Sequence, residues 1–143
     1  MRSAKRQLGG PQWRCVMLGE FPMSARLAAS DIGRARTWYE EKLGLVPARE
    51  EMGGAGLWYQ CGATWFYLYQ TESAGTAMNT VGGWELTGIE AVMAEMRSRG
   101  VVFEDYDFGE MKTVDGLLTV PPGYKAAWFK DSEGNTLELT EVP

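Results

Sequence analysis

KDSEGNTLELTEV, residues 130–142, has the pattern of a β-hairpin. Its DSEGN segment consists of residue types that tolerate a tight turn. Residues 136–142 then alternate between apolar and polar types, which is typical of a strand with one buried face. Leu137 and Leu139 lie on the buried face, so Glu138 lies on the opposite one. Glu138 therefore either faces water or lines a cavity. The patterns in the rest of the sequence are needed to distinguish these two alternatives.

Length and composition are those of an ordinary globular protein. The chain has 143 residues, which suits one domain or two small fused modules, and 45% of them are hydrophobic. The formal net charge of −5 argues against nucleic acid as a partner. No apolar run approaches the roughly 20 residues that a membrane span needs, so we expect no membrane segment.

Histidine is absent from the chain. This removes the commonest transition-metal ligand and the commonest general base. The only cysteines, Cys15 and Cys61, are far apart, so we expect no disulfide framework and a reducing, cytoplasmic location. The 6 Trp, 6 Tyr and 5 Phe indicate either a well-packed core or an aromatic-lined pocket.

The chain divides at Met23, where regular patterning begins. Residues 1–22 are rich in Arg and Lys, and we expect a flexible N-terminal extension there. Residues 23–143 are expected to form a single domain of two modules, at about 23–75 and 80–143.

The expected elements have the order βαβββ twice, which predicts an α+β fold. In the first module they are a strand at 24–30, a helix between Asp31 and Gly44, and strands at 49–51, 56–60 and 64–70. In the second module they are a strand at 82–86, a helix from the capping box Thr87–Glu90 to Gly100, a strand at 101–108, and a hairpin of 125–131 with 135–141.

Two segments carry a resemblance to a known family. SARLAASDIGRARTWYEEKLGL, residues 24–45, and AAWFKDSEGNTLELTE, residues 126–141, resemble the opening and the closing hairpin of the vicinal oxygen chelate superfamily. This is the glyoxalase/bleomycin-resistance/dioxygenase fold, and the resemblance covers about residues 23–143. It implies two tandem βαβββ modules whose strands curl into a half-open cavity, in agreement with the repeat.

The resemblance also implies positions for metal ligands, which are usually His, Gln or Glu. These positions correspond here to Ser24, Tyr67, about Val81, and Glu138. Only Glu138 has a side chain of the ligand type, and the others cannot complete a site for Zn²⁺, Ni²⁺ or Fe²⁺. We therefore expect no catalytic metal and no cofactor.

Alternation along the strands predicts which side chains share the cavity with Glu138. Phe66, Leu68 and Leu27 are expected to pack under a helix instead. Two simpler alternatives remain open: the aromatic residues fill the space, or Arg26 and Glu138 form a buried ion pair. The candidate ligand-binding residues are Ser24, Arg26, Trp65, Tyr67, Tyr69, Trp128 and Glu138.

Residues 106–124 form the longest stretch expected to be irregular, because they contain three Gly and a Pro-Pro pair. This stretch is either a flap over the cavity, with Met111 and Tyr124 as ligand contacts, or an ordinary surface loop.

Two functions compete. One is a metal-independent small-molecule binding protein of the bleomycin-resistance type. In it, aromatic side chains stack on the ligand and Glu138 selects a cation or a hydrogen-bond donor. The other is a metal-free isomerase or lyase with Glu138 as general acid or base. By analogy with the superfamily, we expect a homodimer.

Overall fold

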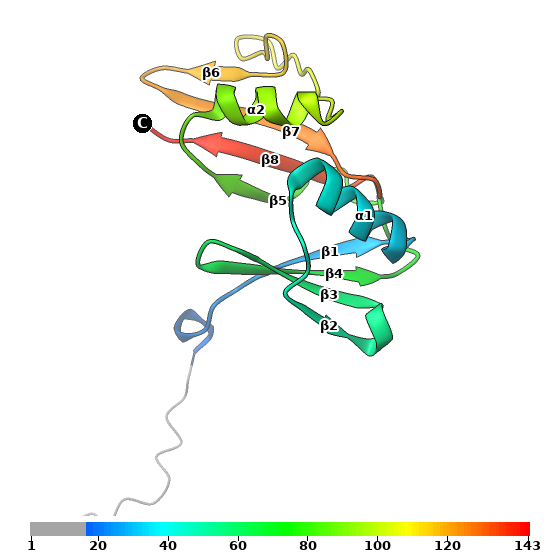
Figure 1. Ribbon diagram of the computed structural model, residues 1–143. Helices are drawn as coiled ribbons and strands as arrows, with labels where there is room; N and C mark the ends of the chain where they lie inside the picture. The colour runs from blue at the N-terminus through cyan, green and yellow to red at the C-terminus, as the bar shows by residue number, and fades with distance from the viewer. Residues whose placement is uncertain (1–16) are drawn as a thin grey trace, which may run out of the picture.

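A computed structural model describes residues 17–143, which form two consecutive βαβββ units (Figure 1). Module 1 comprises β1 (Ala25–Ala29), α1 (Ile32–Leu43), β2 (Arg49–Glu51), β3 (Gly56–Cys61) and β4 (Thr64–Gln70). Module 2 comprises β5 (Thr80–Glu85), α2 (Ile89–Ser98), β6 (Leu118–Val120), β7 (Tyr124–Lys130) and β8 (Thr136–Glu141). Short 3-10 turns occur at Leu18–Glu20 and Met52–Gly54.

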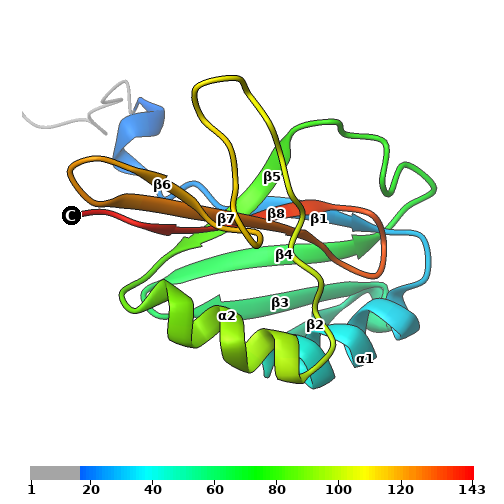
Figure 2. The same ribbon diagram turned by 90° about the horizontal axis from the view of Figure 1, so that it is seen from above.

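The two modules have the same sheet topology. The strand orders are β1-β4-β3-β2 and β5-β8-β7-β6, and in each sheet the first pair is parallel and the other pairs are antiparallel. Both helices lie on the same side of the sheets (Figure 2). Neither helix is long and apolar enough to cross a membrane. The predicted α+β fold with an internal repeat is confirmed.

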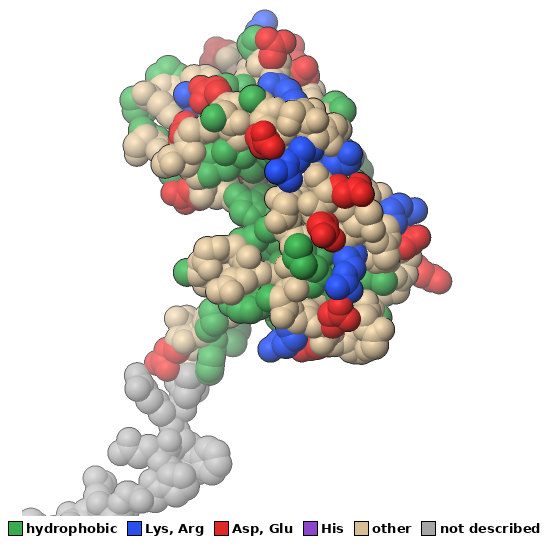
Figure 3. Space-filling view, in the orientation of Figure 1, with side chains coloured by type: hydrophobic (Ala, Val, Ile, Leu, Met, Phe, Trp, Pro, Cys, Tyr) green, Lys and Arg blue, Asp and Glu red, His purple; other side chains and the backbone are tan. Residues whose placement is uncertain are grey.

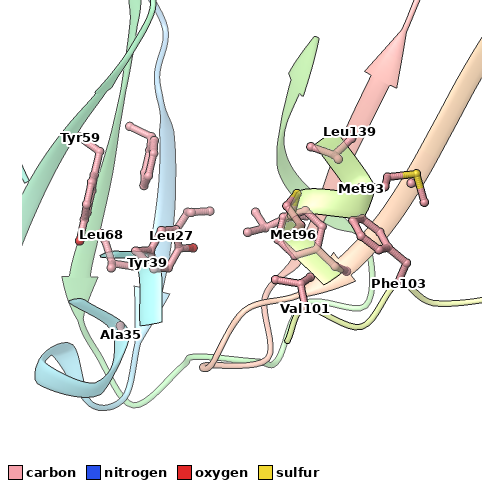
Figure 4. Close-up of a cluster of buried hydrophobic side chains, with 14 of the residues drawn as sticks. Leu27, Ala35, Tyr39, Tyr59, Leu68, Met93, Met96, Val101, Phe103 and Leu139 are labelled. Atoms are coloured by element: carbon pink, nitrogen blue, oxygen red, sulfur yellow. The ribbon is translucent and has the colours of Figure 1, made fainter. Parts of the chain in front are cut away.

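Alternate strand residues and one face of each helix form the core (Figure 4). Leu27 and Leu68 are buried beneath α1 as predicted, and so is Phe66. Ala35 and Tyr39 are the fully buried residues of α1. Burying a leucine of this kind contributes roughly 1.5–3 kcal/mol relative to leaving it exposed. Module 2 contributes a second set of buried side chains, among them Met93, Met96, Val101, Phe103, Leu137 and Leu139.

The turn between β7 and β8 is organised by Asp131. One oxygen of its carboxylate accepts hydrogen bonds from the backbone amides of Glu133 and Asn135, both at 2.9 Å. The other oxygen accepts one from the hydroxyl of Tyr39 at 2.7 Å. Gly134 has a φ of 85°, a conformation that glycine adopts without strain. The turn that the sequence predicts is therefore present, and it is tied to α1 of module 1.

The same turn connects the two modules through Glu133. Its carboxylate accepts hydrogen bonds from the guanidinium of Arg34, at 2.9 and 3.0 Å, and from the backbone amide of Asp31 at 2.9 Å. The side-chain amide of Asn135 donates to the carbonyl of Ala28 at 2.8 Å. These bonds reach from the last hairpin of the chain to the start of its first helix. They hold the modules together at one end.

The predicted strand at 101–108 is wrong. Within this range Phe103 and Asp107 make only isolated bridges, to Phe129 and Lys112. The third strand of module 2 is instead β6, which lies inside the stretch that we expected to be irregular. The carboxylate of Asp105 provides the reason, because it binds the hydroxyl of Thr113 and the amide of Gly116, both at 2.8 Å. These bonds fold residues 105–116 into a closed loop.

The predicted capping box at Thr87–Glu90 is also wrong. Gly88 is the N-cap of α2, with a φ of 73°, and no side chain caps the helix. Its backbone amide donates to the carboxylate of Glu141. Glu90 pairs instead with the ammonium of Lys125 at 2.5 Å. A tertiary contact from β8 therefore takes the place of the local cap.

The N-terminal extension was predicted for residues 1–22. Residues 1–16 lie outside the described part of the chain, so the structure covers only its last six positions. Of these, Leu18–Glu20 form the 3-10 turn, and residues 17–22 are exposed.

Candidate functional site

The candidate site residues lie on the face of the sheets away from the helices. Leu68 and Phe129 point into the core, so their strand neighbours Tyr67 and Trp128 point to the other face. In Figure 2 the helices lie along one side, and the loop between α2 and β6 extends on the other. This open face carries two groups of contacting side chains, one on each sheet.

The first-sheet cluster consists of Arg26, Trp58, Tyr67 and Tyr69. The rings of Trp58 and Tyr67 have centroids 4.7 Å apart, and those of Tyr67 and Tyr69 stack at 5.8 Å with an interplanar angle of 9°. The guanidinium carbon of Arg26 lies 4.8 Å from the Trp58 ring and 5.4 Å from the Tyr67 ring. Such cation–π contacts hold the guanidinium against the aromatic surface. The cluster therefore presents a positive charge on an aromatic platform.

Trp58 is a functional candidate that the sequence analysis missed. A second guanidinium, that of Arg49, lies 5.2 Å from its ring. The indole nitrogen is buried and has no hydrogen-bond partner among the described residues. The sequence carried a usable signal, since Trp58 lies directly opposite Tyr67 in the β3–β4 hairpin.

The second-sheet cluster consists of Trp128, Glu138, Tyr106 and Tyr124. The indole N–H of Trp128 donates to Oε2 of Glu138 at 2.7 Å. The ring of Tyr106 meets that of Trp128 edge-on, with centroids 5.5 Å apart. Burial, together with the negative charge of Glu138, raises the pKa of Tyr124. The cluster therefore presents a carboxylate held within an aromatic wall.

Tyr106 also anchors the loop that was expected to be either a flap over the cavity or an ordinary surface loop. Its hydroxyl donates to Glu104, which in turn pairs with Lys130 at 2.7 Å. Burial and the Glu104 contact raise the pKa of Tyr106 to about 12, so this hydroxyl stays protonated. Tyr124 lies near Glu138, whereas Met111 remains about half exposed.

Ser24 and Trp65 lie together at the junction of the modules. Both line a small cavity of about 160 Å³, which also includes Gly83 of β5. Trp65 is 40% exposed, so its ring is only partly covered. The cavity is too small for a drug-sized molecule, whose pockets are usually about 300–1,000 Å³.

The seven predicted residues therefore fall into three local groups. In the described part of the chain, no hydrogen bond, ion pair or ring contact joins the first-sheet cluster to the second-sheet cluster. In particular, Arg26 and Glu138 do not form an ion pair with each other. A single aromatic box that contains all seven residues stays a prediction.

A larger apolar cavity, of about 500 Å³, lies on the helix side between the modules. Its walls include Leu43, Trp84, Val92, Met96 and Phe129, and none of the predicted site residues lines it. Trp84 stacks on Phe129, with centroids 6.2 Å apart. Hydrophobic side chains gather in the hollow between the two modules in Figure 3. Charged residues, among them Lys42, Glu95 and Arg99, also line this cavity. We place the candidate site on the opposite face, because the predicted residues Arg26 and Glu138 are held by aromatic side chains there.

The residues at the superfamily's ligand positions do not fit a metal centre. Ser24, Tyr67 and Val81 supply no imidazole or carboxylate, and the carboxylate of Glu138 is bound by Trp128. Within residues 17–143, no group of three or more Cys, Asp or Glu side chains is placed to hold an ion. The donor set is too poor for a catalytic metal.

No protein-family model and no curated protein matches the sequence. Solved structures do match, at low sequence identity. The glyoxalase/bleomycin resistance protein of Catenulispora acidiphila DSM 44928 has a TM-score of 0.63 and 24% identity, over 85% of this chain and 97% of that one. A glyoxalase family protein of Enterococcus faecalis has a TM-score of 0.63 and 22% identity, over 87% and 100%.

A bleomycin-binding protein, solved in complex with bleomycin, has a TM-score of 0.64 and 14% identity, over 86% of this chain and 99% of that one. Together with the module repeat, these similarities show that the chain has the fold of the vicinal oxygen chelate superfamily.

Proposed function

We propose that the protein binds a small molecule without a metal, on the face that carries the two clusters. The carboxylate of Glu138 is the main support for this proposal. Trp128 satisfies Oε2, while Oε1 has no hydrogen-bond partner among the described residues. A half-buried carboxylate with one oxygen available can select a cation or a hydrogen-bond donor.

The aromatic side chains around the two charges supply the second support. Four aromatic rings offer faces or edges to a flat ligand, and they belong to Trp58, Tyr67, Tyr69 and Trp128. The bleomycin-bound structure shows that a protein with this fold can hold a small molecule. The same use of the fold is proposed for this chain.

The test measures binding of a cationic aromatic probe, (6-methylnaphthalen-2-yl)methylamine, by isothermal titration calorimetry. Glu138→Gln is expected to weaken binding roughly ten-fold or more, since hydrogen bonds to charged groups contribute about 1.5–3 kcal/mol. Glu95→Gln is the matched control, because Glu95 is an exposed carboxylate of α2 that lines the helix-side cavity. Equal affinity in wild type and Glu138→Gln would remove Glu138 from the site.

We also propose that the protein is a homodimer in the cytoplasm. The cytoplasmic location rests on the two widely spaced cysteines, of which Cys61 is a free thiol. The homodimer rests on analogy with the superfamily. Size-exclusion chromatography with light scattering is expected to give twice the chain mass of 15.9 kDa. A monomer at all protein concentrations would contradict the proposed homodimer.

A further inference from the structure

The first-sheet cluster belongs to a single row of residues that crosses β2, β3, β4 and β1. Arg49 lies opposite Trp58, Trp58 lies opposite Tyr67, and Tyr67 lies opposite Arg26. Because directly opposite residues point to the same face, all four side chains share the open face. The row ends at β1, the strand at the junction with module 2.

An equivalent row crosses the second sheet. Gly83 lies opposite Glu138, and Glu138 lies opposite Trp128. Position by position, Trp128 corresponds to Trp58, Glu138 to Tyr67, and Gly83 to Arg26. Each module therefore has a tryptophan in the third strand from the junction. At the junction itself, β1 carries the Arg26 side chain, whereas β5 has Gly83 and no side chain.

The two rows meet where β1 approaches β5. A Cβ built on Gly82 would lie 3.7 Å from both Ala25 and Leu27, on the core side. Gly83, the next residue, is exposed and belongs to the open face, opposite Glu138. At this position the floor of the open face between β1 and β8 is therefore bare backbone of β5.

The opposite charges on this floor are held apart. The guanidinium of Arg26 leans over Trp58 and Tyr67, and among residues 17–143 it has no carboxylate partner. Glu138 is held by Trp128. Opposite charges that do not pair with each other, on either side of a strand without a side chain, favour a ligand that brings its own pair of charges.

We propose that the ligand is dipolar. It carries a carboxylate or similar anion for Arg26, a protonated amine for Glu138, and a flat apolar body that lies over Gly83. This inference rests on the proposed function, because it assigns a ligand class to the same site.

The test compares three naphthalenes of equal shape by isothermal titration calorimetry. They are 6-(aminomethyl)-2-naphthoate, which is dipolar, 6-methyl-2-naphthoate, which is an anion, and (6-methylnaphthalen-2-yl)methylamine, which is a cation. The dipolar probe is expected to bind at least about ten-fold more tightly than either singly charged probe, since each end contributes a charge-assisted hydrogen bond.

Variants then assign each end of the probe. Arg26→Gln is expected to weaken the dipolar and anionic probes about ten-fold and to leave the cationic probe unchanged. Arg26→Lys keeps the positive charge, so the variant is expected to retain most of the preference for the dipolar probe over the cationic one. Arg36→Gln is the control, because Arg36 lies on α1 and pairs with Glu50 at 2.5 Å. It is expected to leave all three affinities unchanged.

The outcomes separate the inference from the proposed function. If the cationic probe binds as tightly as the dipolar one and still depends on Glu138, the dipolar ligand is wrong and the binding function stands. The same holds if Arg26→Gln leaves the dipolar probe unaffected. If none of the three probes binds the wild-type protein, both proposals fall.

Discussion

Glu133 lies in the last turn of the chain, yet its carboxylate binds groups of the first module. Its side chain is fully buried, whereas that of Arg34 is about half exposed. Burial opposes the charge of Glu133, but hydrogen bonds from Arg34, the Asp31 amide and Ser132 outweigh it and lower the pKa to about 2. The folded state therefore holds Glu133 ionised well below the ordinary value of 4.5.

This shift predicts a specific loss of stability in acid. Because the folded pKa is the lower one, the Glu133 contribution is complete above pH 4.5 and is lost as the pH falls towards 2. Its size is on the order of 2 kcal/mol, after allowance for the exposure of Arg34. Urea unfolding of wild type and Glu133→Gln between pH 7 and 2.5 measures it. The free energy difference between the two proteins should shrink with decreasing pH, and a constant difference would contradict the assignment.

At single positions, the sequence was informative where burial follows from alternation. Leu27, Phe66 and Leu68 are buried as predicted. The position of Trp58 opposite Tyr67 followed from the predicted hairpin, but its contact with Arg26 did not, because that contact depends on how far the Arg26 side chain reaches across β4. Tyr106 reaches Trp128 from a loop, and no periodic pattern describes a loop.

Two adjacent glycines of β5, Gly82 and Gly83, differ in how closely β8 packs against them. A Cβ on Gly83 would lie 2.6 Å from the carbonyl oxygen of Glu138, a backbone atom that cannot move without shifting β8. A Cβ on Gly82 would meet its nearest atom, in the side chain of Leu137, at 3.6 Å. Close β5–β8 packing therefore requires glycine at only one of the two positions.

The matched pair Gly83→Ala and Gly82→Ala tests this difference. Gly83→Ala is expected to lower the free energy of unfolding by about 1–3 kcal/mol, the usual cost of overpacking. Gly82→Ala is expected to change it by less than about 1 kcal/mol. Thermal and urea unfolding of both variants provide the measurement. Equal changes in the free energy of unfolding would show that β5–β8 packing does not require glycine at position 83.

Elements with strong local signals were predicted well. The side chain of Asp31 caps α1 by accepting from the Arg34 amide, and Gly44 ends the helix with a φ of 69°, so both bounds follow from local chemistry. The start of α2 and the location of β6 depend on distant partners instead. Glu141 binds the Gly88 amide, and Asp105 closes the loop before β6, and neither contact is visible in a local pattern.

For the whole molecule, the repeat of βαβββ and the family resemblance of the two end segments together predicted the fold. Each module buries the helix-facing side of its own sheet, so the order of elements constrains the architecture. The relation between the two clusters was not predictable, because it depends on how β1 and β5 meet. Gly82 lies at that approach, since a Cβ built on it would lie 3.7 Å from the side chains of Ala25 and Leu27, which are remote in sequence.

Metal-independent binding is tested most directly by native mass spectrometry of the purified protein. Spectra are recorded before and after addition of Ni²⁺, Zn²⁺, Mn²⁺ and Fe²⁺ in turn, each with and without the dipolar naphthalene probe. We expect no specific metal adduct, and a probe adduct whose abundance does not change with metal or EDTA. One metal ion per chain, lost in Glu138→Gln and required for the probe to bind, would contradict the account.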